Sequence, residues 1–238
     1  MRGILFDLDG TLLDINLGAF LERYFRALAA ASRPVFKEGL DEARFMSAIN
    51  AGTARMMDVH PGRTNQEVFA EAFRDGTGLD FDSVWPLFEC FYAEVFPTLR
   101  DGAGPAAGAR EAVEAALGCG LGVVIATNPI FPRVAIEERL RWARLDDLRL
   151  DHITDYETMT SCKPHGEYFT QALHMMKLGP TECMMVGDDR YLDMSAADIG
   201  LLTFYVGDSP DAVADFRGTL EDLARLIPRL VATSDADG

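Results

Sequence analysis

The sequence contains no apolar run that approaches the ~18 residues a membrane-spanning helix requires, so we do not expect a membrane protein. It is also poor in cysteine: four are present in 238 residues, widely separated and without a CxxC pair. A disulfide framework or a structural zinc site is therefore not expected, and a cytoplasmic location is the simpler prediction.

Positive charge is scarce as well. The chain has 22 Lys and Arg against 38 Asp and Glu, so its formal net charge is −16. This balance repels nucleic-acid phosphates and anionic membrane surfaces, and neither is an expected partner. It would equally repel a small phosphorylated substrate, unless a metal ion or local positive groups neutralise the site.

The sequence does contain a series of short apolar runs typical of strands that are buried on both faces. These runs are Gly3–Phe6, Leu121–Ala126, Leu150–Thr154, Cys183–Val186 and Leu201–Val206. Helical patterns separate them at Gly108–Leu117, Pro132–Leu140, Pro164–Lys177, Asp193–Asp198 and Leu220–Leu230. The alternation predicts a Rossmann-like α/β core of three layers around a parallel sheet, with its chemistry at the carboxyl ends of the strands.

One long stretch after the first strand breaks the alternation, because it shows four helical stripes and no convincing strand. The stripes are Leu17–Leu28, Leu40–Ile49, Val68–Phe73 and Phe81–Val95. Thr64 begins a predicted capping box before the third stripe, and Pro86 is expected in the first turn of the fourth. We therefore expect an inserted helical-bundle domain at 15–98 on an α/β core formed by 1–14 and 99–238.

The first candidate site is Asp7-Leu8-Asp9-Gly10-Thr11, at the end of the first predicted strand. Carboxylates two residues apart on an extended chain point to the same side. They are costly neighbours unless a cation neutralises them or one carries a proton. A carboxylate can attack phosphorus, and a protonated neighbour can donate to the leaving oxygen. The alternative is an Asp-Gly turn that caps a helix.

Two further candidates are single residues that follow later strands. Thr127 and the backbone N–H groups beside it, including that of Asn128, could hold an anionic oxygen, although Thr127 taken alone is better explained as the N-cap of a helix before Pro129. Pro164 fits the first position of a helix, which would place Lys163 near the strand ends. There its charge could offset carboxylate and phosphate groups, whereas an isolated lysine is ordinarily solvated.

The fourth candidate is the segment Gly187–Asp193, which contains three acids at a predicted strand-to-helix turn. Asp188, Asp189 and Asp193 together suit a hard cation that prefers oxygen ligands, namely magnesium. Acids also favour helix N-termini without any metal. Three of them in seven residues exceed what a single cap requires.

In this order, the four sites resemble the haloacid dehalogenase-like hydrolase superfamily. Its hallmark is an N-terminal DxDGT element, followed by a Ser or Thr, a Lys and a GDxxxxD-type element. The resemblance covers the whole chain, because the helical insertion lies where subclass I members carry their cap. It implies a Mg²⁺-dependent phosphomonoester phosphatase that acts on a small phosphorylated metabolite, as a monomer or homodimer.

The resemblance also implies roles for the first motif and the metal ligands. Asp7 would attack phosphorus to form an aspartyl-phosphate, which water then hydrolyses. Asp9 would protonate the leaving alcohol and later activate the water. Mg²⁺ would be held by the Asp7 side chain, the Asp9 backbone carbonyl and Asp188.

The remaining roles concern phosphate binding and charge. By similarity, Thr127 and Asn128 would bind the phosphoryl group through the hydroxyl and backbone amides. Lys163 would balance the charge between nucleophile and phosphate. Asp193 would orient Lys163 or a metal-bound water.

Two other functions stay open. A phosphosugar mutase of the β-phosphoglucomutase type would share these residues, although Thr53-Ala54-Arg55 is only a loose echo of that subgroup's Ser-Arg element. A non-catalytic interaction protein could keep the fold, but such relatives usually lose the nucleophile or a metal acid. Dehalogenases lack the second acid and need no metal, so Asp9 and Asp188 argue against dehalogenation.

Overall fold

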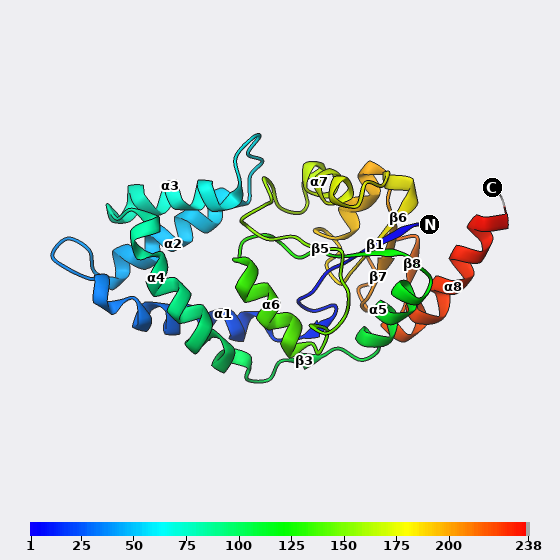
Figure 1. Cartoon of the computed structure of the whole chain (residues 1–238), viewed down its shortest axis with the longest axis horizontal. Helices are drawn as coiled ribbons and strands as arrows, with labels where there is room; N and C mark the ends of the chain where they lie inside the picture. Colours follow the sequence, from blue (N-terminus) through cyan, green and yellow to red (C-terminus); the bar gives the residue numbers. More distant parts are fainter. Residues whose placement is uncertain (237–238) are drawn as a thin grey trace.

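A six-stranded parallel sheet forms the centre of the α/β part of the computed structural model, which describes residues 1–236 (Figure 1). Its order is β5-β4-β1-β6-β7-β8. The strands are β1 (Gly3–Phe6), β4 (Gly122–Ile125), β5 (His152–Ile153), β6 (Cys183–Gly187), β7 (Leu202–Tyr205) and β8 (Phe216–Arg217). All five predicted strands are present, with ends that differ by no more than two residues. The edge strand β8 was not predicted, because two residues give no periodicity.

Helices cover both faces of this sheet. They are α5 (Ala109–Gly118), α6 (Arg133–Trp142), α7 (Gly166–Met176), α8 (Leu220–Ala236) and the 3₁₀ helix Met194–Ile199. Side chains alternate along β1, so Ile4 and Phe6 join one buried cluster with α5, α6 and α8. Leu5 joins a second cluster on the other face, with α7 and the 3₁₀ helix. The predicted α/β class with three layers is confirmed.

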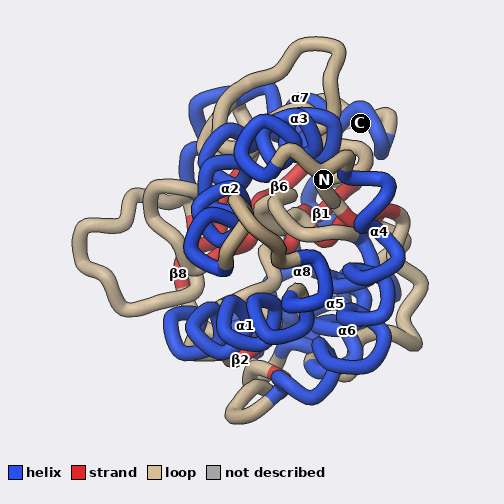
Figure 2. The backbone as a smooth tube through the Cα atoms, turned by 90° about the vertical axis from the view of Figure 1, so that its left-hand side faces the viewer, coloured by secondary structure: helices blue, strands red, loops and turns tan. Residues whose placement is uncertain are grey.

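The long stretch between β1 and β4 is helical. It contains α1 (Leu17–Ala31), the 3₁₀ helix Arg33–Val35, α2 (Glu42–Met56), α3 (Asn65–Thr77), α4 (Phe81–Cys90), the π-helical segment Phe91–Val95 and the 3₁₀ helix Phe96–Arg100. Figure 2 views the molecule from this end. Two short strands, β2 (Leu13–Asp14) and β3 (Gly104–Pro105), flank the stretch and pair antiparallel. The segments that lead into and out of the insertion are thus bonded to each other.

Local capping decides where the insertion helices begin. The predicted capping box is confirmed: the Thr64 hydroxyl accepts the Glu67 N–H at 3.2 Å, and the Glu67 carboxylate accepts the Thr64 N–H at 2.8 Å. The prediction for Pro86 was wrong, because it lies inside α4 rather than in the first turn. The helix begins directly after Asp80, whose carboxylate accepts the Ser83 N–H at 3.3 Å.

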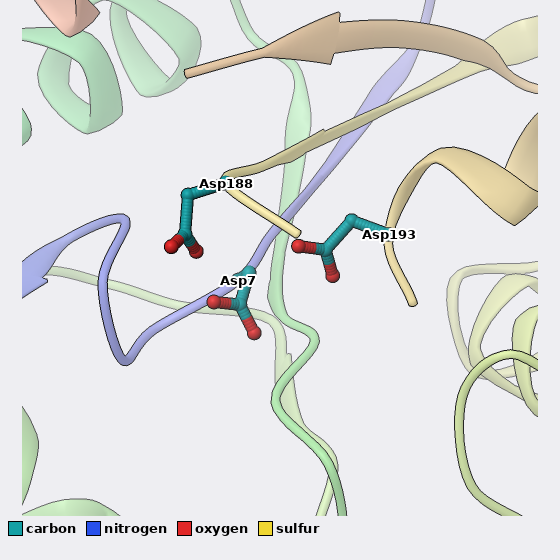
Figure 3. Close-up of side chains that lie close together, drawn as sticks. All are labelled: Asp7, Asp188 and Asp193. Atoms are coloured by element: carbon teal, nitrogen blue, oxygen red, sulfur yellow. The ribbon is translucent and has the colours of Figure 1, made fainter. Parts of the chain in front are cut away.

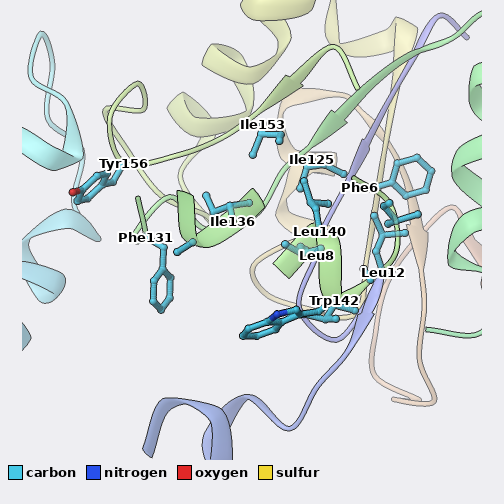
Figure 4. Close-up of a cluster of buried hydrophobic side chains, with 14 of the residues drawn as sticks. Phe6, Leu8, Leu12, Ile125, Phe131, Ile136, Leu140, Trp142, Ile153 and Tyr156 are labelled. Atoms are coloured by element: carbon cyan, nitrogen blue, oxygen red, sulfur yellow. The ribbon is translucent and has the colours of Figure 1, made fainter. Parts of the chain in front are cut away.

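Aromatic side chains attach the insertion to α6 and the loop before it. Trp142 stacks on Phe96 with ring centroids 5.4 Å apart, and Phe20 packs edge-on against Trp142 at 5.8 Å. Phe131 meets Tyr24 in an edge contact at 5.3 Å. Figure 4 shows Trp142 and Phe131 on the side of the α/β part that faces α1. Such pairs stabilise an interface beyond their buried area.

A second contact between the insertion and the α/β part is made by backbone hydrogen bonds. The N–H of Asn65 donates to the Met159 carbonyl at 2.7 Å, and that of His60 donates to the Thr160 carbonyl at 2.8 Å. The insertion therefore contacts α6, the loop after β4 and the loop after β5. Among residues 1–236, no helix has both the length and the hydrophobicity to cross a membrane.

The closest helix pair in the insertion, α2 and α3, gives a stability prediction. A Cβ atom at Gly76 would lie 2.5 Å from the Cβ of Ala48, which has no rotamer with which to withdraw. We expect Gly76→Ala to lower the free energy of unfolding by about 1–3 kcal/mol, although alanine favours a helix. Urea denaturation measures the change.

Gly18→Ala is the matched control. Gly18 is helical in α1, and its added Cβ would meet no heavy atom closer than 3.6 Å. We expect this variant to be stabilised by about 0.4–1 kcal/mol. Equal stabilisation of both variants would contradict the close packing of α2 against α3.

Candidate active site

Three neighbouring strands bring predicted site residues to one edge of the sheet. β1 lies between β4 and β6, so Asp7, which follows β1, is adjacent to Asp188, which follows β6. Thr127 follows β4 at the same edge. Figure 3 shows the side chains of Asp7, Asp188 and Asp193 close together, with the Asp188 carboxylate pointing toward Asp7. One oxygen from each lies within 4.8 Å of the others.

Thr11 links two of these carboxylates. Gly10 has a φ of +89°, a left-handed conformation in which the chain turns back on itself after Asp9. The turn directs the Thr11 hydroxyl to Asp188 at 2.9 Å and to Asp7 at 3.3 Å. Thr11 belongs to the first sequence motif, but its hydrogen bonds to the two carboxylates were not predicted. It holds Asp188 in place relative to Asp7.

Lys163 lies between two acids. Its ammonium is 2.7 Å from Asp7 and 2.6 Å from Asp193, and its side chain is buried. Burial alone would lower the pKa of Lys163, but Asp193 and Asp7 together hold that pKa well above its usual value. Lys163 is therefore charged. The prediction that α7 begins at Pro164 was wrong, because the helix begins at Gly166.

Asn128 and Thr127 are fixed by hydrogen bonds from other segments. The Asn128 side-chain oxygen accepts the Lys163 backbone N–H at 2.9 Å, which positions Lys163 without a helix N-terminus. The Thr127 carbonyl accepts the hydroxyls of Thr154 at 2.7 Å and Tyr168 at 2.9 Å. Thr127 does not cap a helix, because α6 begins well beyond it.

Arg139 is a site residue that the sequence did not predict. Its side chain is 1% exposed, forms an ion pair with Asp9, and lies over the Phe131 ring at 4.6 Å from the centroid. In the helix Arg133–Trp142 it is one of several charged residues, most of them on the surface. One sequence signal for its burial was available. Arg139 is three residues from the apolar Ile136, and this spacing places both side chains on the same, buried face of the helix.

The pairing of Asp9 with Arg139 is incomplete. Within the described residues, Asp9 Oδ1 and Arg139 Nη2 are buried and have no hydrogen-bond partner. Burial raises the pKa of Asp9, Arg139 opposes the rise, and the charge of Asp7 adds to it. Asp9 is thus a carboxyl group that can hold a proton more readily than an exposed aspartate.

These side chains line one pocket of about 280 Å³, which we call the acidic pocket. Five carboxylates border it, those of Asp7, Asp9, Asp188, Asp189 and Asp193, against the two cations of Arg139 and Lys163, so its formal charge is 2 − 5 = −3. Burial and then the charge of Asp7 raise the pKa of Asp188 to about 6. Clustered carboxylate oxygens are the donor set of Mg²⁺, so these residues fit a divalent cation.

The carboxylates of Asp189 and Asp193 are occupied by hydrogen bonds and an ion pair within the protein, rather than being available to a cation. The Asp189 carboxylate accepts the backbone N–H groups of Tyr191 at 2.7 Å and Leu192 at 2.9 Å. Asp193 pairs with Lys163 and accepts the Asp189 N–H at 3.0 Å. The carboxylates of Asp7 and Asp188 are therefore the pair best placed to share a cation.

The sequence profile of the haloacid dehalogenase-like hydrolases matches residues 1–198, and the chain belongs to this family. The chain is also 33% identical over 131 residues to haloacid dehalogenase-like hydrolase domain-containing protein 3 from Xenopus laevis. That match covers 55% of this chain and 51% of the relative, about half of each.

Solved structures share the fold. A HAD phosphatase from Thermococcus onnurineus superposes with a TM-score of 0.59 at 20% identity, covering 95% of this chain and 98% of that one. A provisionally assigned β-phosphoglucomutase from Thermotoga maritima gives a TM-score of 0.58 at 19% identity, covering 97% and 100%. At these identities the similarity concerns the fold alone.

The buried ion pair between Asp9 and Arg139 gives a prediction about stability. Arg139→Met leaves the Asp9 carboxylate buried without its cation, so we expect the free energy of unfolding to fall by about 3–5 kcal/mol. The double variant Arg139→Met with Asp9→Asn should regain part of the lost free energy of unfolding, because it leaves no unpaired buried charge. Urea denaturation of the four proteins measures the coupling.

Arg141→Met is the control from the same helix. Arg141 is 55% exposed and pairs with Glu138. Its loss is expected to cost at most about 1 kcal/mol. Strict additivity of the Arg139 and Asp9 substitutions would contradict an energetic link between them.

Proposed function

We propose that this hydrolase is a Mg²⁺-dependent phosphomonoester phosphatase acting on a small phosphorylated metabolite through an aspartyl-phosphate. One observation carries the proposal. The Asp7 carboxylate is held by Lys163 at 2.7 Å and lies beside Asp188, while Asp9 borders the same pocket. The proposed nucleophile, compensating cation, metal ligand and proton donor thus line one pocket of about 280 Å³.

The proposed reaction has two steps. Lys163 and Thr11 hold the Asp7 carboxylate, and one of its oxygens forms a bond to phosphorus as the bond to the leaving alcohol oxygen breaks. Protonated Asp9 gives its proton to that oxygen. Asp9, now ionised, then takes a proton from water, which attacks phosphorus and releases phosphate from Asp7. The raised pKa of Asp9 supports the first of its roles.

The proposed Mg²⁺ ligands are the carboxylates of Asp7 and Asp188 and the backbone carbonyl of Asp9. The formal charge of −3 in the acidic pocket supports this proposal, because a phosphate dianion would otherwise be repelled. Bound Mg²⁺ supplies positive charge that stabilises the transferring phosphoryl group. Asp193 would keep Lys163 oriented, as its contact at 2.6 Å suggests.

The proposed phosphate contacts are the Thr127 hydroxyl and the backbone N–H groups beside it. The Asn128 side chain is engaged with Lys163, so its contribution would come from the backbone. Positioning and charge stabilisation are the main demands of phosphoryl transfer. The fixed Thr127 carbonyl supports the required rigidity.

We also propose that residues 15–98 form a cap domain on the core of 1–14 and 99–238. The antiparallel pair β2 and β3 at its base supports this division, as do ring contacts within the insertion, such as Phe45 with Phe73 at 5.5 Å and Phe73 with Phe81 at 5.8 Å. We infer a cytoplasmic enzyme, monomeric or homodimeric, with a small molecule as its partner.

The nucleophile assignment predicts the effect of Asp7→Asn. The amide has nearly the same shape but is a poor nucleophile, so Mg²⁺-dependent hydrolysis of p-nitrophenyl phosphate should fall by roughly 10³-fold or more. Release of p-nitrophenol measures this directly. Retention of full activity by the variant would overturn the assignment.

Asp14→Asn is the matched control, since Asp14 is an exposed acid outside the acidic pocket. Its activity should equal that of the wild type. Glucose 1-phosphate, assayed for released phosphate and for glucose 6-phosphate, separates the rival reaction. Conversion to glucose 6-phosphate without release of phosphate would favour a mutase over a phosphatase.

The role of Asp9 as the acid predicts a dependence on the leaving group. Asp9→Asn should slow hydrolysis of alkyl phosphates by roughly 10²-fold or more, because an alkoxide needs a proton to leave. p-Nitrophenyl phosphate should be affected much less, because its phenolate leaves without one. Equal slowing of both substrates would count against this role.

A further inference from the structure

A second cavity, which we call the apolar cavity, lies between the insertion helices and the loops after β4 and β5, beside the acidic pocket. Its volume is about 120 Å³. All four insertion helices and the loops after β4 and β5 contribute to its wall, through residues such as Leu28, Ile49, Phe69, Trp85, Phe131 and Tyr156. In Figure 4, Phe131 and Tyr156 lie on the side of the α/β part that faces the insertion.

The wall of the apolar cavity offers little to a polar group. Within the described chain, none of its lining residues is charged. The hydroxyls of Tyr24 and Tyr92 bond to each other at 2.9 Å, and the Thr53 hydroxyl donates to the Ile49 carbonyl at 3.0 Å. A polar ligand group placed here would lose its hydrogen bonds to water and find few replacements.

The apolar cavity and the acidic pocket share part of their walls. Leu21, Ile130 and Phe131 line both. The guanidinium of Arg139, which pairs with Asp9 and lines the acidic pocket, lies over the Phe131 ring at 4.6 Å from its centroid. A molecule with its phosphate in the acidic pocket would therefore have the apolar cavity next to its leaving alcohol.

We propose that the apolar cavity binds the alcohol part of the substrate, and that the substrates are monophosphate esters of small apolar alcohols. This inference rests on the proposed phosphatase function and names its substrate class. An alkyl chain of about four carbons or one ring fits, since an apolar cavity of ~150 Å³ accommodates benzene and excludes water. Sugar phosphates, whose hydroxyl groups need partners, are disfavoured.

The apolar cavity also has a physical reason to be filled. Its wall atoms lack contact partners when it is empty, and a buried apolar group restores those dispersion contacts. The same burial removes apolar ligand surface from water. Binding energy gained there can orient the phosphate at Asp7.

A pair of esters of almost equal size tests the proposal. n-Butyl phosphate and 2-methoxyethyl phosphate differ by one methylene replaced by an ether oxygen. The ether makes the alcohol a better leaving group, so a preference for the butyl ester cannot come from leaving-group chemistry. We expect kcat/KM of the Mg²⁺-loaded enzyme to be roughly tenfold higher for n-butyl phosphate, the discrimination expected of an apolar pocket.

Variants of the wall connect this preference to the apolar cavity. Thr53→Phe fills it from α2, so the ratio of the two kcat/KM values should fall toward one. Ala51→Phe adds the same ring on the exposed face of α2 and should keep the wild-type ratio. Trp85→Ala enlarges the apolar cavity from α4 and should move the preference from the butyl to the n-hexyl ester, a gain that damage to the fold cannot produce.

Binding of n-butanol alone provides a measurement without catalysis. Trp85 lines the apolar cavity, so its fluorescence should change in a saturable way in the wild type and in Ala51→Phe, but not in Thr53→Phe. Asp7-dependent release of phosphate without preference for the butyl ester would overturn the substrate class and leave the phosphatase intact. Absence of phosphate release from every ester would overturn both proposals. A butyl preference that Thr53→Phe leaves unchanged would contradict the role of the apolar cavity.

Discussion

The structure depends on the balance of charge at the carboxyl edge of the sheet. Five carboxylates border the acidic pocket and two cations oppose them. Lys163 bridges Asp7 and Asp193, which would otherwise repel each other, and Arg139 pairs with Asp9. The negative charge that is left over is the basis of the proposed binding of a divalent cation and of a phosphate group at this edge.

The position of this balance follows from the fold. Parallel strands end at one edge, so residues far apart in the chain meet there without long loops. The insertion borders the same pocket through Leu17 and Leu21 of α1. Its aromatic contacts with Trp142 and Phe131 fix it against α6, the helix that carries Arg139. Packing of the insertion and placement of the acid–arginine pair are thus linked through one helix.

Much of this could be predicted from the sequence. Buried strands read as apolar runs, and Asp7, Thr127 and Asp188 could be placed because each follows such a run. The capping box was equally predictable, from Thr64 and the Glu67 that follows it three residues later. These signals are local, so the residues beside each one suffice to interpret it.

The rest depends on contacts between distant segments. Arg139 resembles a surface residue of a charged helix until Asp9 is brought to it. Lys163 is positioned by Asn128 rather than by the helix start predicted from Pro164. The pairing of β2 with β3 and the apolar cavity arise only when the insertion is packed, and no pattern along the chain marks either one.

Magnesium binding tests the central claim most directly. Isothermal titration calorimetry with MgCl₂, on the wild type and on Asp188→Asn, compares the proposed site with and without one of its carboxylates. Asp14→Asn serves as the control. The account predicts saturable binding of one ion to the wild type and the control, and strong weakening in Asp188→Asn. Unchanged Mg²⁺ affinity in Asp188→Asn, or no binding to the wild type, would contradict it.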